Sequence, residues 1–158
     1  MLTIGECRLR VVAVLVFAWV SLVLPAQAQD ETTTDIAFVG ELMAFHGSKA
    51  IVDVMTTHCY ETTGLDPTYK EASANWYLRN ISYLDLADRV ITRLGGGTEG
   101  QQKAAETYGG SQIMSAYNQA PDKDNFCRTF LEQVESGAFD IDKQLPGPLK
   151  RAQEIATS

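Results

Sequence analysis

Two cysteines, Cys59 and Cys127, constrain the fold of this chain more than any other feature of its sequence. The chain has 3 cysteines in all, and the third, Cys7, falls within a segment that reads as a removable leader. An even pair of cysteines in an exported protein forms a disulfide by default. A Cys59–Cys127 bond would close a loop of about 69 residues, for which the chain-entropy model gives a stabilisation of about 4 kcal/mol. The sequence therefore predicts that these two distant positions touch.

Residues 1–28 have the pattern of a secretory signal peptide. The pattern consists of a basic start, an apolar run too short to span a bilayer, and an A-x-A cleavage site, namely Arg8 and Arg10, Val11–Leu24, and Ala26-Gln27-Ala28. We expect a mature protein of residues 29–158 that forms one domain. Its expected location is the periplasm or the medium, with no attachment to the membrane after cleavage.

The charge of the chain limits its expected partners. Loss of residues 1–28 removes 2 of the 13 basic and 1 of the 20 acidic residues, which leaves 11 against 19 and a net charge of about −8. Nucleic acids and anionic membranes attract basic surfaces, so the composition argues against both. It is compatible with a basic partner and also with solubility alone.

Apolar residues recur at the helical period, and no strand pattern stands out. The expected helices cover about residues 35–63 and 67–94, a third segment that starts after Thr98, residues 121–137, and a short segment at 149–155. Turn and cap residues separate them: Gly64, the Asp66-Pro67 pair, the Gly95-Gly96-Gly97 run, and the Thr98/Gln101 capping box. We expect Gly109-Gly110 to interrupt the third helix, and Leu145-Pro146-Gly147-Pro148 to be extended.

These elements predict an all-α fold, an antiparallel bundle of about four helices with a short C-terminal helix. Short connections make consecutive helices antiparallel. The end of the first helix and the start of the fourth then lie at the same end of the bundle. Cys59 and Cys127 occupy those two places, so the helix order and the cysteine count predict the same disulfide independently.

The neighbours His58 and Cys59 invite a catalytic or metal-binding interpretation, which the spacing does not favour. Adjacent helical residues point about 100° apart, so His58 is badly placed to deprotonate Cys59. His46 lies roughly 18 Å from His58 along a straight helix. A zinc site needs about four clustered ligands, and a di-iron bundle needs Glu-x-x-His on two helices. We therefore expect no catalytic residue, no metal site and no cofactor, and a protein that is not an enzyme.

Two further patterns have simple explanations. Gly95–Gly100 matches G-x-G-x-x-G, but a helix precedes it instead of the strand that a dinucleotide site requires, so a linker is expected. Asp122 and Asp124 suit a helix N-terminus. Asp140 and Asp142 lie in a predicted loop, where weak calcium binding is the alternative.

The most distinctive stretch contains Trp76, Arg79 and Asn80, which share one face of the second helix because they are three and four residues apart. One interpretation places Trp76 in the core, with Arg79 and Asn80 bonded to helix ends or carboxylates. The other makes the three residues a surface for a partner or ligand.

The layout resembles small periplasmic immunity proteins that neutralise type VI secretion effectors. The resemblance covers roughly residues 50–137 and consists of an exported leader, a cysteine that ends the first helix, Ala72-Ser73-Ala74-Asn75-Trp76 in the second helix, and a cysteine in the last long helix. It implies a role in binding a protein without catalysis.

The expected function is therefore non-enzymatic binding of a protein partner, as an inhibitor or immunity factor. Two alternatives stay open. One is a periplasmic helical carrier of a small ligand or metal, and the other is a stress chaperone that exposes apolar surface at low pH.

Overall fold

The structure, a computed structural model, describes residues 28–158. The predicted leader and Cys7 lie outside these residues, apart from Ala28. Every regular element in the described range is a helix: α1 (Ala28–Thr62), α2 (Thr68–Arg93), α3 (Glu99–Gln119), α4 (Lys123–Glu135), α5 (Ile141–Gln144) and α6 (Pro146–Thr157). None of these helices is both long enough and apolar enough to cross a bilayer.

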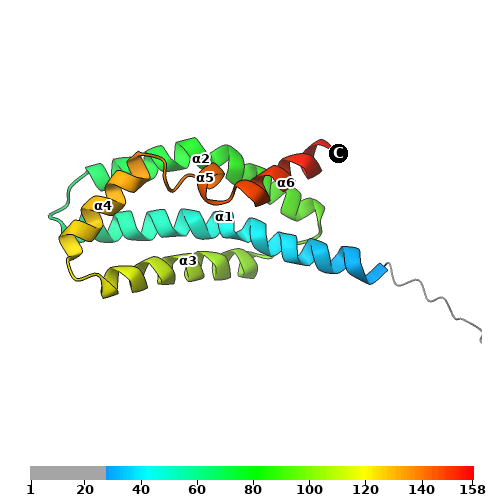
Figure 1. Cartoon of the computed structure of the whole chain (residues 1–158), viewed down its shortest axis with the longest axis horizontal. Helices are drawn as coiled ribbons and strands as arrows, with labels where there is room; N and C mark the ends of the chain where they lie inside the picture. Colours follow the sequence, from blue (N-terminus) through cyan, green and yellow to red (C-terminus); the bar gives the residue numbers. More distant parts are fainter. Residues whose placement is uncertain (1–27) are drawn as a thin grey trace, which may run out of the picture.

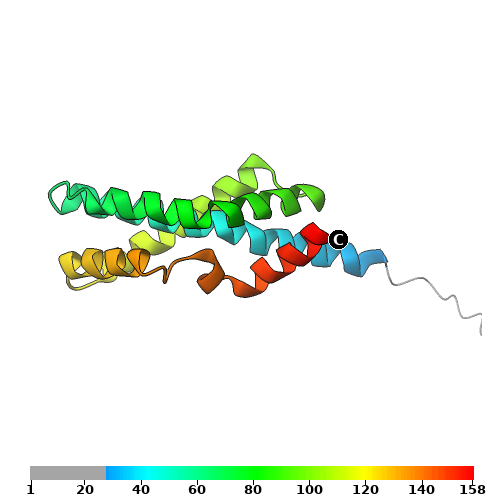
Figure 2. The ribbon, with the colours of Figure 1, turned by 90° about the horizontal axis from the view of Figure 1, so that it is seen from above.

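Helix α1 is the centre of the bundle. It runs between α2 and α3 (Figure 1), and α4, α5 and α6 follow one another along a further side (Figure 2). The α4 and α6 helices pack on both α1 and α2. The first four helices alternate in direction, so the expected all-α antiparallel bundle is confirmed.

The predicted helix ends are largely confirmed, because local hydrogen bonds determine them. Gly64 has a φ of 84°, and the N–H of Leu65 donates to the carbonyl of Tyr60 at 2.9 Å, which closes the end of α1. At the start of α2, the carboxylate of Asp66 accepts from the N–H and hydroxyl of Thr68 at 3.0 and 2.7 Å. These two bonds lower the pKa of Asp66.

The third helix differs from the prediction, since α3 runs unbroken through Gly109 and Gly110. Both glycines are buried against α1, and a Cβ atom at Gly109 would overlap the backbone of Gly47. The two glycines let α1 and α3 approach closely. A glycine inside a helix lowers stability by roughly 0.5–1 kcal/mol relative to alanine, and the close packing of α1 and α3 offsets this loss.

The segment predicted to be extended is also different, because α6 begins at Pro146. Pro146 and Pro148 both lie in the first helical turn, where the backbone N–H groups have no partner within the helix. Proline therefore costs little there, and the last helix is longer than the expected 149–155.

The core is formed between α1 and the helices around it. Its fully buried side chains include Phe38, Leu42, Phe45, Val52, Met55, Trp76, Val90, Phe130, Val134 and Ile141. Each large apolar side chain contributes roughly 1.5–3 kcal/mol on burial. Because Ile141, Leu149 and Ala152 are buried too, the C-terminal helices complete this core.

The predicted disulfide is confirmed. Cys59 and Cys127 are bonded, with Cα atoms 5.6 Å apart, and both are buried. The bond joins the end of α1 to the start of α4, at the end of the bundle that the helix order predicts.

Candidate functional site

His58 is a packing residue at the disulfide end of the bundle. Its ring meets the ring of Tyr117 edge to face, with centroids 4.5 Å apart, and Tyr117 in turn meets Phe126 at 5.7 Å. The buried Nε2 of His58 has no hydrogen-bond partner among residues 28–158. Since Cys59 is in the disulfide, the His58–Cys59 pair offers no free thiol.

His46 is buried and connects three helices. Its Nε2 lies 2.8 Å from Oδ1 of Asp88 on α2, and its Nδ1 lies 3.4 Å from the side-chain nitrogen of Gln102 on α3. If the amide nitrogen of Gln102 donates to Nδ1, the proton of neutral His46 is on Nε2 and donates to Asp88. These contacts tie α1 to α2 and α3 at His46.

Trp76, Arg79 and Asn80 bond α2 to the chain from the end of α4 to the start of α5. Trp76 Nε1 donates to the carbonyl of Phe139 at 2.9 Å, and Arg79 donates to the carbonyl of Val134 at 2.7 Å. Asn80 accepts the N–H of Ile141 at 2.8 Å. Trp76 and Asn80 have no exposed surface, so these contacts support the structural interpretation of the three residues.

Asp140 is the partner that sequence reasoning missed. Arg79 donates to both of its carboxylate oxygens at 3.0 Å, and Asn80 donates to Oδ1 at 3.0 Å. Burial alone would raise the pKa of Asp140, but the hydrogen bonds from Arg79 and Asn80, with the charges of Arg79 and Lys143, lower it overall. We call Trp76, Arg79, Asn80 and Asp140 the latch, because they join α2 to the segment before α5.

The calcium alternative for Asp140 and Asp142 has little geometric support. Asp140 is paired with Arg79 within the latch, whereas Asp142 lies 3.6 Å from Lys143. Within residues 28–158, no three histidine, cysteine or acidic side chains gather closely enough to hold a metal ion.

The Gly95–Gly97 run forms the turn between α2 and α3, with positive φ angles at Gly95 and Gly97.

Two hollows open along α1 and share Gly40. The larger, about 580 Å³, lies between α1 and the α2–α3 turn, and the smaller, about 350 Å³, lies between α1, α3 and the junction of α5 and α6. We call them together the α1–α3 groove. Four small residues of α1 line the groove: Gly40, Ala44, Gly47 and Ser48. Two exposed apolar residues also line it, Ile36 of α1 and Tyr108 of α3, which are 68% and 66% accessible.

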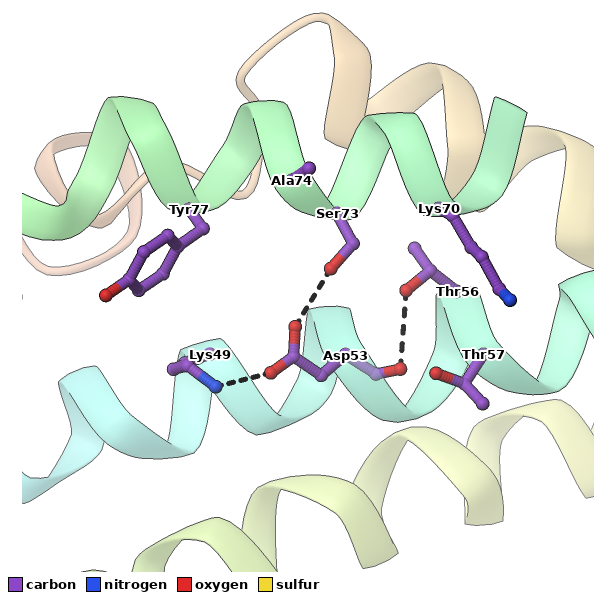
Figure 3. Close-up of a pocket in the computed structure, with 8 residues that line it drawn as sticks. All are labelled: Lys49, Asp53, Thr56, Thr57, Lys70, Ser73, Ala74 and Tyr77. Atoms are coloured by element: carbon purple, nitrogen blue, oxygen red, sulfur yellow. Dashed lines mark hydrogen bonds and ion pairs between the residues drawn. The ribbon is translucent and has the colours of Figure 1, made fainter. Parts of the chain in front are cut away.

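A third hollow, of about 400 Å³, lies between α1 and α2 and is lined mostly by residues with polar groups (Figure 3). We call it the lysine groove. Its walls are Lys49, Asp53, Thr56 and Thr57 from α1, and Lys70, Ser73, Ala74 and Tyr77 from α2. Asp53 lies in the middle, bonded to Lys49 and, at 2.9 Å, to the hydroxyl of Ser73.

Comparison of the chain with protein-family models, curated proteins and solved structures returns no match.

Proposed function

We propose that the protein works by binding a helical segment of a protein partner in the α1–α3 groove, without catalysis, as an inhibitor or immunity factor does. The main observation behind this proposal is the groove itself. It is open, it lies along α1, and its lining includes two exposed apolar side chains, Ile36 and Tyr108. Exposed apolar surface concentrated in a groove is typical of interaction sites.

The floor of the groove favours a helix as the occupant. Gly40, Ala44 and Gly47 follow one another at spacings of four and three residues, so they lie in a row on one face of α1. Small residues in such a row let a second helix come close. Helix α3 already does so at the Gly47–Gly109 contact, just beyond the open part of the row.

Site-specific photo-cross-linking tests the proposal. A benzophenone amino acid replaces Ile36, Tyr108 or, as the control, Leu78 in cells of the source organism. Leu78 is equally exposed, at 70%, but lies on α2 and lines neither hollow. We expect Ile36 and Tyr108 to capture the same protein and Leu78 to capture none of it.

A groove-filling variant completes the test. A Cβ atom at Gly40 meets nothing within 4 Å, so the side chain introduced by Gly40→Leu starts in open space and extends into the groove. We expect Gly40→Leu to abolish both adducts while the unfolding temperature stays the same or rises. Adducts that persist in Gly40→Leu, or that form equally from Leu78, would refute the proposal.

A further inference from the structure

The lysine groove differs in charge from the rest of this acidic chain. Its lining contains two lysines and one aspartate, whereas the whole sequence has 13 basic and 20 acidic residues. The spacing explains how the groove is assembled. Lys49, Asp53 and Thr57 are four residues apart on α1, Lys70, Ser73 and Tyr77 are three and four apart on α2, and the two rows face each other (Figure 3).

The single carboxylate of the groove is already satisfied. Lys49 pairs with Oδ2 of Asp53, and the hydroxyl of Ser73 donates to Oδ1 at 2.9 Å. These contacts come from the α1 side and from the α2 side, so they hold Asp53 between the helices. The negative charge of Asp53 therefore balances the positive charge of Lys49, and Lys70 supplies the net positive charge of the groove lining.

Lys70 has no carboxylate partner among the described side chains. Its ammonium lies 3.8 Å from the ring centre of Tyr60, which holds it at the mouth of the groove without neutralising it. The exposed Thr57 adds a hydroxyl at the same end, as Figure 3 shows. An ammonium and a hydroxyl together are suitable donors for a carboxylate.

The other end of the groove contains an aromatic ring above Lys49. The ring of Tyr77 lies along the wall there and is 39% exposed (Figure 3). A volume of about 400 Å³ lies within the range of small-molecule sites in proteins. We propose that the lysine groove binds a small organic carboxylate, with the carboxylate at Lys70 and Thr57 and the apolar part against Tyr77.

Titrations followed by amide chemical shifts test this proposal on the mature protein. The probes are butyrate, its neutral analogue butyramide, and the cation butylamine, at equal ionic strength. We expect saturable shifts at Thr57, Lys70 and Ser73 with butyrate only. An acetylated tripeptide with a free carboxyl terminus distinguishes the source of the carboxylate. Tighter binding of this peptide than of butyrate would identify the ligand as the carboxyl terminus of a polypeptide and not a free organic acid.

Matched variants make the result specific. Lys70→Gln removes one charge-assisted contact, so it should weaken butyrate binding about tenfold. Lys150→Gln, on the exposed face of α6, should leave the binding unchanged. Equal shifts with butyramide, shifts that do not saturate, or Lys70→Gln with wild-type affinity would overturn the proposal. The lysine groove shares no lining residue with the α1–α3 groove, so this test is independent of the proposed function.

Discussion

At the scale of single residues, the contact between Gly47 and Gly109 sets how closely α1 and α3 pack. A side chain at Gly109 would meet the backbone of Gly47, which cannot yield as a flexible side chain does. We expect Gly109→Ala to lower the free energy of unfolding by about 1–3 kcal/mol, as overpacked cores do. Urea denaturation followed by circular dichroism measures the change.

Gly40→Ala is the matched control for Gly109→Ala, because it is the same substitution in a neighbouring helix. Its Cβ atom meets open space, and alanine favours a helix over glycine by roughly 0.5–1 kcal/mol. Gly40→Ala should therefore stabilise the protein slightly. Similar destabilisation by both variants would show that close packing at Gly109 is not the cause.

Asp140 should make the stability of the fold depend on pH in the acid range. Its pKa in the folded protein is lowered, chiefly because the bonds from Arg79 and Asn80 outweigh the effect of burial. A lowered folded pKa contributes stability that is complete above the unfolded value of about 3.9 and is lost as the pH falls through the folded pKa. We expect the unfolding temperature to drop below about pH 4 for this reason.

Two amide variants isolate this contribution. Asp140→Asn keeps an oxygen that can accept hydrogen bonds but removes the charge, so its unfolding temperature should fall less steeply between about pH 4 and pH 2. Asp142→Asn changes a neighbour whose ion pair, at 3.6 Å, is with Lys143, and should keep the wild-type slope. Parallel slopes in all three proteins would exclude Asp140 as the source.

Residue-level chemistry was predictable where it depends on neighbours in the sequence. The reciprocal bonds of Thr98 and Gln101 and the positive φ of Gly64 follow from patterns a few residues long. The role of Gly109 was not predictable, because it depends on a residue of α1 far away in the sequence. From local propensity alone, a buried glycine contact and a helix break look the same.

At the scale of elements, the latch ties α2 to the segment that leads into α5 and α6. Asn80 is fully buried and accepts the N–H of Ile141 at 2.8 Å. Asn80→Ala leaves that buried N–H without a partner, which should cost about 1–3 kcal/mol. We expect amide hydrogen exchange to accelerate most in residues 141–157.

Asn75→Ala is the control for the latch, since Asn75 lies on the exposed face of the same helix. It should leave exchange in α5 and α6 at the wild-type rate. Uniform acceleration over all helices in Asn80→Ala would mean that the latch supports the whole core and not the C-terminal elements in particular.

The sequence was informative about which helices form and less so about how they meet. Periodicity indicated α1 to α4, and a helix face placed Trp76, Arg79 and Asn80 together. The pairing of Asp140 with Arg79 was not predicted, because it joins segments 61 residues apart. Likewise, each wall of the lysine groove is visible as a spacing, but the register between α1 and α2 that brings Ser73 to Asp53 is not.

At the scale of the whole molecule, the disulfide joins α1 and α4 across 68 residues of sequence. The chain-entropy model assigns a loop of this length a stabilisation of about 4 kcal/mol. We expect the double variant Cys59→Ala, Cys127→Ala to lose most of that amount in urea denaturation. The wild type in reductant should match the double variant, while the double variant should not respond to reductant.

The overall architecture was predictable because two constraints agree on it. Alternating helices place the ends of α1 and α4 together, and the cysteine pair requires the same arrangement. The grooves were not predictable, because they depend on where small side chains such as Gly40 leave space between elements.

The most direct test of this account is the intact mass of the protein, produced from its full sequence in an oxidising compartment and purified without reductant, followed by mapping of its peptides. The account holds that Cys59 is structural and that the molecule acts by binding. It predicts a chain two hydrogen atoms lighter than the dithiol form, with one cross-linked peptide that contains Cys59 and Cys127. A full-weight chain whose Cys59 reacts with a thiol reagent in the folded state would contradict it, and would make His58 and Cys59 a candidate for chemistry again.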